Sequence, residues 1–192
     1  MDPINIIIGI NVIALFGANI STAKRGLISA VGQYKEKPST YLQALPTALA
    51  TLSLIALIFA LFQIGTLGYS NENISLRIIA LIIDLTSSWL QIVVQKSLKG
   101  NYSQDVVIFK KHTLITTGLF KWIRHPQYFF QILIEFAVAI AVLSYVVFAF
   151  ALVQIPFLIL RARLEEKILE KHFKDEFVSY KKSTGFIIPF IK

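Results

Sequence analysis

The sequence lacks cysteine altogether, which excludes disulfide bonds, thiolate metal sites and cysteine nucleophiles in one step. Charged side chains are also scarce: they make up 16% of the 192 residues, against roughly 25% in a typical soluble domain. Hydrophobic residues reach 55%, and the mean hydropathy is +0.65. So apolar a chain cannot cover itself with polar surface in water, and it is too hydrophobic to be disordered.

The charge that is present is mostly of one sign, because 19 basic residues outnumber 11 acidic ones and give a net charge of +8. In a soluble protein such an excess would suggest nucleic acid as a partner. Here the basic residues flank long apolar runs, so we expect an anionic membrane surface and membrane lipids as partners, and no nucleic acid.

Runs without charge divide the chain into membrane-spanning segments. A spanning helix needs about 20 mostly apolar residues, and we predict such helices at about 4–22, 42–68 and 76–94, the last containing Asp84. The next apolar segment, 128–160, has 33 residues. As a single helix it would measure about 50 Å, which is too long for a hydrocarbon core of about 30 Å.

The distribution of basic residues favours a hairpin over 128–160. With the N-terminus outside and this segment folded back on itself, three stretches lie on the inner side: 23–41, 95–127 and 161–192. That side then carries 18 of the 19 basic residues, and only Arg77 lies at an outer edge. This is the distribution that the positive-inside rule describes.

The predicted fold is therefore an all-α, polytopic membrane helix bundle of about five spans, whose last two form a helical hairpin. We expect one membrane domain over 1–192, with the N-terminal spans in 1–94 and the motif-bearing half in 95–192. The first span follows Asp2 and Pro3 rather than a basic start, so it is expected to be retained and not cleaved as a signal peptide. An amphipathic C-terminal helix is predicted on the inner face, and its apolar stripe suits a membrane surface: Leu164, Ile168, Leu169, Phe173 and Phe177.

A first candidate site is Arg124-His125-Pro126, at the start of the hairpin. Proline suits the first helical position, where its missing N–H would be unpaired anyway. The next N–H groups point out of the helix end, so with Arg124 and His125 they form an anion site. The same residues also fit a helix that simply starts at the membrane interface.

The remaining candidates are charges within or next to apolar segments. Arg161 and Glu165 are four residues apart and share one helix face, although a solvated amphipathic helix would show the same spacing. Asp84 and Glu135 lie inside apolar runs, where a charge is costly, so each is expected to face the bundle interior or a water-filled cavity. No metal site is predicted, because His112 and His172 lack companion ligands.

The order of these motifs resembles the signature of the isoprenylcysteine carboxyl methyltransferase family, whose members are integral-membrane enzymes related to phospholipid N-methyltransferases. The resemblance covers about residues 95–192. It rests on the stretch 112–128, which ends in Arg-His-Pro-Gln-Tyr, on Arg161-x-x-x-Glu165-Glu166 after an apolar hairpin, and on 172–180 with the following Thr184-Gly. Each motif is weak singly, but the ordered set is specific.

The resemblance implies S-adenosylmethionine as cofactor, with S-adenosylhomocysteine as its product, and makes 95–192 a methyltransferase core. Glu165 would bind the cofactor, and Arg161 would face the methyl acceptor as a catalytic residue. The family usually has tyrosine where Phe120 stands, so one hydroxyl contact is missing. The complete set of predicted cofactor-binding residues is His112, Thr113, Leu114, Ile115, Phe120, Arg124, His125, Pro126, Gln127, Tyr128, Glu165 and Glu166.

The acceptor is expected to be a lipophilic small molecule or a lipid-anchored substrate, methylated on a carboxylate or on a phospholipid amine. A carboxylate needs a cation such as Arg161 and no base, whereas an amine must lose a proton, for which Glu135 is the catalytic candidate. The cofactor site is predicted on the cytoplasmic side of an integral, multi-pass membrane protein. Two alternatives remain: a membrane reductase of sterol-reductase-like architecture that uses NADPH, and a non-enzymatic small carrier built around Asp84 and Glu135.

Overall fold

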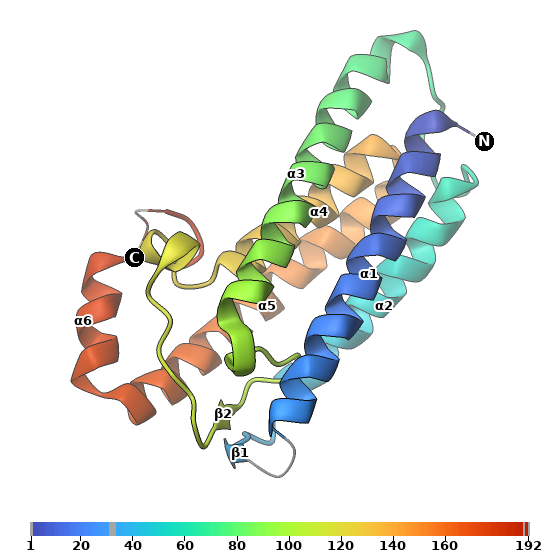
Figure 1. Ribbon diagram of the computed structural model, residues 1–192. Coiled ribbons are helices and arrows are strands. Elements are labelled where there is room, and N and C mark those ends of the chain that lie inside the picture. The colour runs from blue at the N-terminus through green and yellow to red at the C-terminus, as the bar shows by residue number, and fades with distance from the viewer. Residues whose placement is uncertain (1, 31–33, 190, 192) are drawn as a thin grey trace.

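The computed structural model describes residues 2–30, 34–189 and 191, without the side chains of 22–30. The chain is helical, as predicted, apart from one small antiparallel pair of strands (Figure 1). The helices are α1 (Pro3–Ala30), α2 (Leu45–Leu61), α3 (Ile74–Leu98), α4 (Pro126–Ala141), α5 (Tyr145–Phe173) and α6 (Asp175–Ser183). The strands are β1 (Tyr34–Glu36) and β2 (Ile108–Phe109), and 3-10 turns cover Tyr41–Gln43, Asn71–Asn73, Lys99–Asn101 and Gly118–Lys121.

The charge-free runs become the long helices, and this confirms the predicted membrane bundle. Within the described residues, four helical segments are long and apolar enough to cross a membrane, and α4 is a shorter apolar fifth. Two predicted boundaries are wrong. The first helix continues to Ala30, and α2 ends at Leu61 rather than 68 because Gln63 and Gly65 adopt positive φ angles, which a helix does not allow.

The predicted hairpin is present as α4 and α5, which pack against each other across a turn at 142–144. Ser144 caps α5: its Oγ accepts from the N–H of Val147 at 3.3 Å and donates to the carbonyl of Gly65 at 2.9 Å. With 16 residues, α4 measures about 24 Å, less than a full hydrocarbon core. In contrast, α5 runs on past residue 160 to Phe173, so only the first arm is short.

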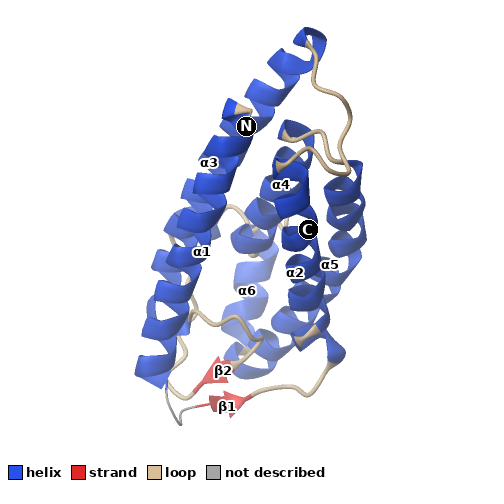
Figure 2. Cartoon of the chain, turned by 90° about the vertical axis from the view of Figure 1, so that its right-hand side faces the viewer, coloured by secondary structure: helices blue, strands red, loops and turns tan. Residues whose placement is uncertain are grey.

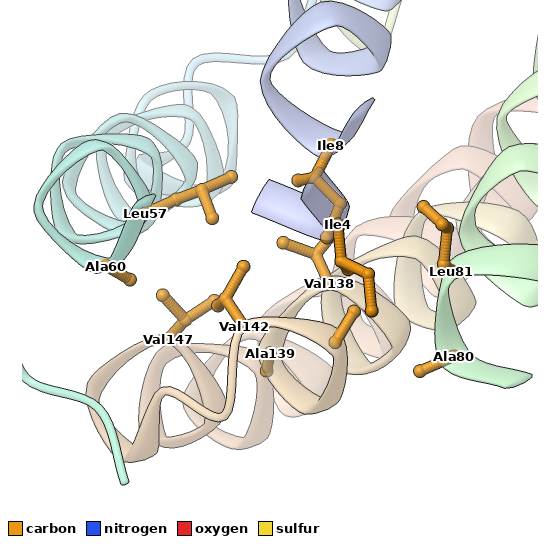
Figure 3. Close-up of a cluster of buried hydrophobic side chains, with 11 residues drawn as sticks. Ile4, Ile8, Leu57, Ala60, Ala80, Leu81, Val138, Ala139, Val142 and Val147 are labelled. Carbon is orange, nitrogen blue, oxygen red and sulfur yellow. The ribbon is translucent and has the colours of Figure 1, made fainter. Parts of the chain in front are cut away.

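The hydrophobic core lies in the half of the bundle that is remote from the strands. Figure 3 shows side chains from α1, α2, α3 and the hairpin meeting there. Alanines at several of these positions let the helices approach closely, which is how membrane helices gain packing energy. The buried cluster consists of Ile4, Ile8, Leu57, Ala60, Ala80, Leu81, Val138, Ala139, Ala141, Val142 and Val147.

Beyond this core, Arg77 closes the end of the bundle that is remote from the strands (the outer end, so named after the predicted orientation). It was predicted at the outer edge, and the structure buries it to 2% exposure. Its guanidinium donates to the carbonyl of Ala141 at 2.8 Å, to both carboxylate oxygens of Asp2 and to Asn5, and it lies over the ring of Tyr69. The hydrogen bond from Arg77 is the main reason that the pKa of Asp2 falls below its usual value.

The long connections gather at the opposite, inner end, where β1, β2 and α6 lie (Figures 1 and 2). Of the predicted inner stretch 23–41, residues 31–33 and the side chains of 23–30 lie outside the described residues. The predicted amphipathic helix is two helices, because the chain turns at Lys174, whose φ is 48°. Part of its apolar stripe packs inside the protein: Ile168 packs on Val106 and Ile108, and Phe177 is buried.

Candidate functional site

A cavity of about 420 Å³ opens at this inner end, below the hydrophobic core. Its walls come from α1 to α5, from α6, and from the connection between α3 and α4. Every predicted site residue lines this cavity except Glu166: His112, Thr113, Leu114, Ile115, Phe120, Arg124, His125, Pro126, Gln127, Tyr128, Glu135, Arg161 and Glu165. The structure thus brings together motifs that are separated by the hairpin in sequence.

The connection that carries the first motif is held by amide side chains. The Nδ2 of Asn101 donates to the carbonyl of Thr113 at 2.9 Å, while the Asn101 Oδ1 accepts from the Thr113 N–H at 3.2 Å. Gln43 makes the same paired contact with the backbone of Val106, at 2.9 Å in both directions. These bonds replace a regular ladder and fix the wall of the cavity around 112–115.

His112 stands in this wall as a neutral ring. Burial, aided by the neighbouring His172, lowers the pKa of His112 to about 4, although Glu165 acts in the opposite direction. Its Nδ1 is buried and has no hydrogen-bond partner among the described residues. A neutral imidazole with a free nitrogen can accept or donate one hydrogen bond to a ligand in the cavity.

Phe120 also lines the cavity, and the C-terminal helix holds it in place. The hydroxyl of Tyr180, on α6, donates to the carbonyl of Phe120 at 2.6 Å. Burial raises the pKa of Tyr180 to about 12, so this donor keeps its proton at all ordinary pH values.

His125 is buried at the start of α4, between two carboxylates of α5. Its Nδ1 lies 3.6 Å from Glu165 and its Nε2 lies 3.4 Å from Glu166, while its ring stacks on Tyr128. Burial lowers the pKa of His125, but the two carboxylates outweigh burial and raise it above its usual value. The two carboxylates therefore favour the protonated ring of His125 at the helix start, and the anion site predicted there stays a prediction.

The guanidinium of Arg124 is engaged within the protein, and its predicted cofactor role stays a prediction. Although Arg124 contributes to the cavity wall, its Nε pairs with Glu166 at 2.5 Å and its Nη1 donates to the carbonyls of Lys181 and Thr184. The backbone N–H of Arg124 donates to the carbonyl of Gly185 at 2.9 Å. Arg124 thus ties the C-terminal segment to the start of α4.

Glu166, likewise, faces away from the cavity. Besides Arg124 and His125 it contacts the ammonium of Lys181 at 3.2 Å, and it lines a separate cleft between α5 and the C-terminal segment. Of the two adjacent glutamates, only Glu165 reaches the cavity, where its side chain keeps 40% exposure.

Arg161 and Glu165 lie one helical turn apart on α5 and face the same cavity, with Tyr128 interacting with both. The guanidinium of Arg161 is buried and donates to the carbonyls of Leu42 and Gln104. Its Nε is buried without a partner in the described part of the chain. A cation anchored on its outer edge and open on another can receive an anionic group.

Asp84 and Glu135 have different surroundings. Asp84 is fully buried between α1 and α3, accepts from Asn11 at 2.9 Å, and does not line the cavity. Glu135 does line it, and accepts from Gln131 at 3.2 Å. The structure therefore gives no support to a carrier path that joins the two carboxylates.

Sequence reasoning missed the amide side chains on the α1 and α3 walls. Gln91, Gln95 and Asn19 all line the cavity, and Gln95 donates to Asn19 at 2.5 Å. A usable signal was present, since two glutamines four residues apart are unusual in an apolar helix. In the described ranges, no group of three or more histidine and acidic side chains could hold a metal ion.

Comparisons with known proteins test whether the chain resembles the family that its motifs predict. The model of the isoprenylcysteine carboxyl methyltransferase (ICMT) family matches residues 78–171. A Saccharomyces cerevisiae protein-S-isoprenylcysteine O-methyltransferase is 37% identical over 98 residues, which cover 48% of this chain and 40% of the yeast protein. A solved structure of the eukaryotic intramembrane Ras methyltransferase ICMT superposes with a TM-score of 0.58 at 23% identity, over 76% of this chain and 52% of that one.

The chain therefore spans about half, or less, of the length of the relatives it matches. These findings confirm the resemblance that the ordered motifs predicted: residues 78–171 match the model of the isoprenylcysteine carboxyl methyltransferase family. The structural likeness adds that the fold is shared.

Proposed function

We propose that this protein is an integral-membrane methyltransferase that transfers a methyl group from S-adenosylmethionine to the carboxylate of a lipophilic, isoprenylcysteine-type acceptor. The observation that carries the proposal is the placement of Arg161 and Glu165 one turn apart on α5, both facing a cavity walled by the motifs of the family. A cation and an anion at one cavity suit two ligands of different charge.

The cavity residues fit the cofactor. Its ammonium and ribose hydroxyls match the carboxylate of Glu165, and its own carboxylate matches His125 and the N–H groups at the start of α4. The unpaired Nδ1 of His112 offers a further buried polar contact. When bound there, the cofactor supplies an electrophilic methyl group on a sulfonium. A cavity of about 420 Å³ is within the usual range for ligand sites.

Arg161 would hold the acceptor. A carboxylate oxygen needs no general base, because no proton leaves when it gains a methyl group. The contribution of the protein is therefore alignment and exclusion of water, for which a buried and doubly anchored guanidinium is well suited.

The position of the cavity explains the need for a membrane. We propose that the cofactor enters from the cytoplasmic side, where the positive-inside rule places the basic connections, while the acceptor reaches the cavity from the bilayer. Labelling of single cysteines introduced within 100–125 of a chain that has none tests this orientation in intact cells. Labelling by a membrane-impermeant reagent added outside would contradict it.

The decisive experiment is methyl transfer in lipid nanodiscs with isotope-labelled S-adenosylmethionine. One acceptor is N-acetyl-S-farnesylcysteine, which offers a carboxylate, and the other is phosphatidylethanolamine, which offers an amine. We expect label in the first as a base-labile methyl ester and none in the second. Label in the phospholipid alone would overturn the carboxylate assignment, and label in neither, from folded protein, would overturn the proposed function.

A further inference from the structure

Glu135 is a carboxylate in the cavity wall, and the proposed transfer to a carboxylate gives it no role. It lies on the same face of α4 as Gln131 and Tyr128, all of which line the cavity. Apolar residues from α1, α2, α4 and α5 line the cavity as well: Val12, Leu15, Leu54, Ile134 and Leu158.

Within the protein this carboxylate has amide neighbours but no cation. Gln131 donates to one of its oxygens at 3.2 Å from the same helix, and the buried side chain of Gln154 on α5 lies within hydrogen-bonding reach of it. Among the described residues no basic side chain forms an ion pair with it. An ionisable group at membrane depth is costly to keep, and such groups mark sites of function.

A second unmatched group belongs to α3, which packs against α4. The Oε1 of Gln95 is buried without a partner in the described part of the chain, although the Gln95 side chain is only 1% exposed and lines the same cavity. Gln91, one turn away, lines it as well. The inner walls on α3 and α4 thus present hydrogen-bonding groups where a plain hydrocarbon chain would need none.

Glu135 is too far from the reacting level to bind the group that Arg161 holds. It follows Tyr128, the neighbour of Arg161, by seven residues, which is about 10 Å along a helix. A group that contacts Glu135 must therefore belong to the part of the acceptor that penetrates deeper than its carboxylate.

We propose that Glu135, together with Gln131, is a specificity-determining residue that binds a hydrogen-bonding group, such as a hydroxyl, on the tail of the acceptor. This inference rests on the proposed function and extends it. It means that the preferred substrate is a carboxylate whose apolar chain carries a polar group near its far end, rather than an unmodified hydrocarbon.

The test compares two acceptors that differ by one group. They are N-acetyl-S-geranylcysteine and the same compound with a hydroxyl on the last carbon of the geranyl chain. For the wild-type protein we expect kcat/KM to favour the hydroxylated acceptor by about tenfold or more, mainly through KM, because a site with buried hydrogen-bonding groups rejects a ligand that leaves them unpaired.

Two variants separate recognition from folding. In Glu135→Leu we expect the preference to invert in favour of the plain chain, whereas Glu135→Gln keeps a hydrogen-bonding side chain and retains the preference. The affinity for S-adenosylhomocysteine, measured on each variant, reports that the cavity is folded. This inference alone is overturned if the wild-type protein methylates the plain chain better, or if Glu135→Leu leaves the ratio of the two kcat/KM values unchanged. If the wild-type protein methylates neither acceptor, the proposed function is overturned as well.

Discussion

Each end of the bundle buries an arginine, but the two arginines differ in how many of their nitrogens are hydrogen-bonded. At the outer end, every nitrogen of the Arg77 guanidinium donates to a carbonyl, a carboxylate or an amide oxygen. At the inner cavity, the buried Nε of Arg161 has no partner in the described ranges. Because buried polar groups are nearly always paired in a finished fold, the pairing of Arg77 fits a structural role, and the unpaired Nε of Arg161 supports the proposed contact with the acceptor.

The same contrast holds between neighbours inside the inner half. Arg124 is bound to Glu166 and to two backbone carbonyls, so it supports the fold. Among the described residues, buried side-chain atoms without a hydrogen-bond partner are found on Gln95, His112, His125 and Arg161, which line the cavity, and on Gln154, which does not. Most of the unpaired buried side chains therefore belong to the cavity wall, whereas the guanidinium of Arg124 is paired within the protein.

The largest effect is expected from Arg124→Met. The substitution removes the nearest of the three basic groups that contact the buried carboxylate of Glu166, which costs up to about 3–5 kcal/mol. Thermal unfolding in detergent should shift strongly downward, and the C-terminal segment should become sensitive to protease. An Arg163→Met control, at an exposed position on the same helix, should leave both readouts unchanged. Normal stability of Arg124→Met would mean that Arg124 is not a structural residue.

The second-largest effect is expected from Arg161→Lys, which should lower kcat/KM for a carboxylate acceptor about 100-fold. A lysine keeps the charge but not the planar fork that receives a carboxylate in two hydrogen bonds. The affinity for S-adenosylhomocysteine, measured by calorimetry, should change little because Glu165 remains. If both quantities fell together, Arg161 would belong to the cofactor site or to the fold instead.

A smaller effect is expected from Arg77→Met at the outer end. It removes charged hydrogen bonds to Asp2, a partly exposed partner, and should lower the free energy of unfolding by about 2 kcal/mol. Cofactor affinity of the folded fraction should equal that of the wild type. A reduced affinity in Arg77→Met would break the distinction between the two ends.

The smallest effect is a pH dependence from His125. Because its pKa is raised in the folded state, the proton on His125 stabilises the fold fully below the unfolded pKa of about 6.5. This stabilisation is lost as the pH rises through the folded pKa. The slope is at most about 1.4 kcal/mol per pH unit, the limit for one proton. Unfolding temperatures from pH 6.5 upward should decline more steeply in the wild type than in His125→Gln, and equal slopes would refute the assignment.

Much of the fold was predictable because charge is so costly in lipid. Charge-free runs located the long helices, and the asymmetry of basic residues selected the hairpin. The ends of α1 and α2 were not predictable. The end of α2 depends on positive φ angles at Gln63 and Gly65, and α1 continues beyond its apolar run. The ordered motifs gave about a third of the residues that line the cavity, and all of the site residues they predicted except Glu166 lie there.

What the sequence did not reveal was which polar side chains pair with each other. Arg124 and His125 are adjacent, yet only the fold shows that Arg124 is taken by Glu166 and the C-terminal carbonyls. Likewise Glu165 and Glu166 are neighbours on α5, and the helix points them in different directions. Glu165 faces the cavity, and Glu166 faces away from it. Such pairing depends on contacts across 40 to 60 residues, and no local pattern contains it.

The most direct test of the central claim is calorimetric binding of S-adenosylhomocysteine to the purified protein, with NADPH as the comparison ligand. Two variants accompany the wild type: Glu165→Ala, in the cavity wall, and Glu170→Ala, a matched glutamate outside it. We predict micromolar binding of S-adenosylhomocysteine, weakened at least about tenfold in Glu165→Ala and unchanged in Glu170→Ala, with no binding of NADPH. Binding of NADPH alone, or full affinity in Glu165→Ala, would contradict the account.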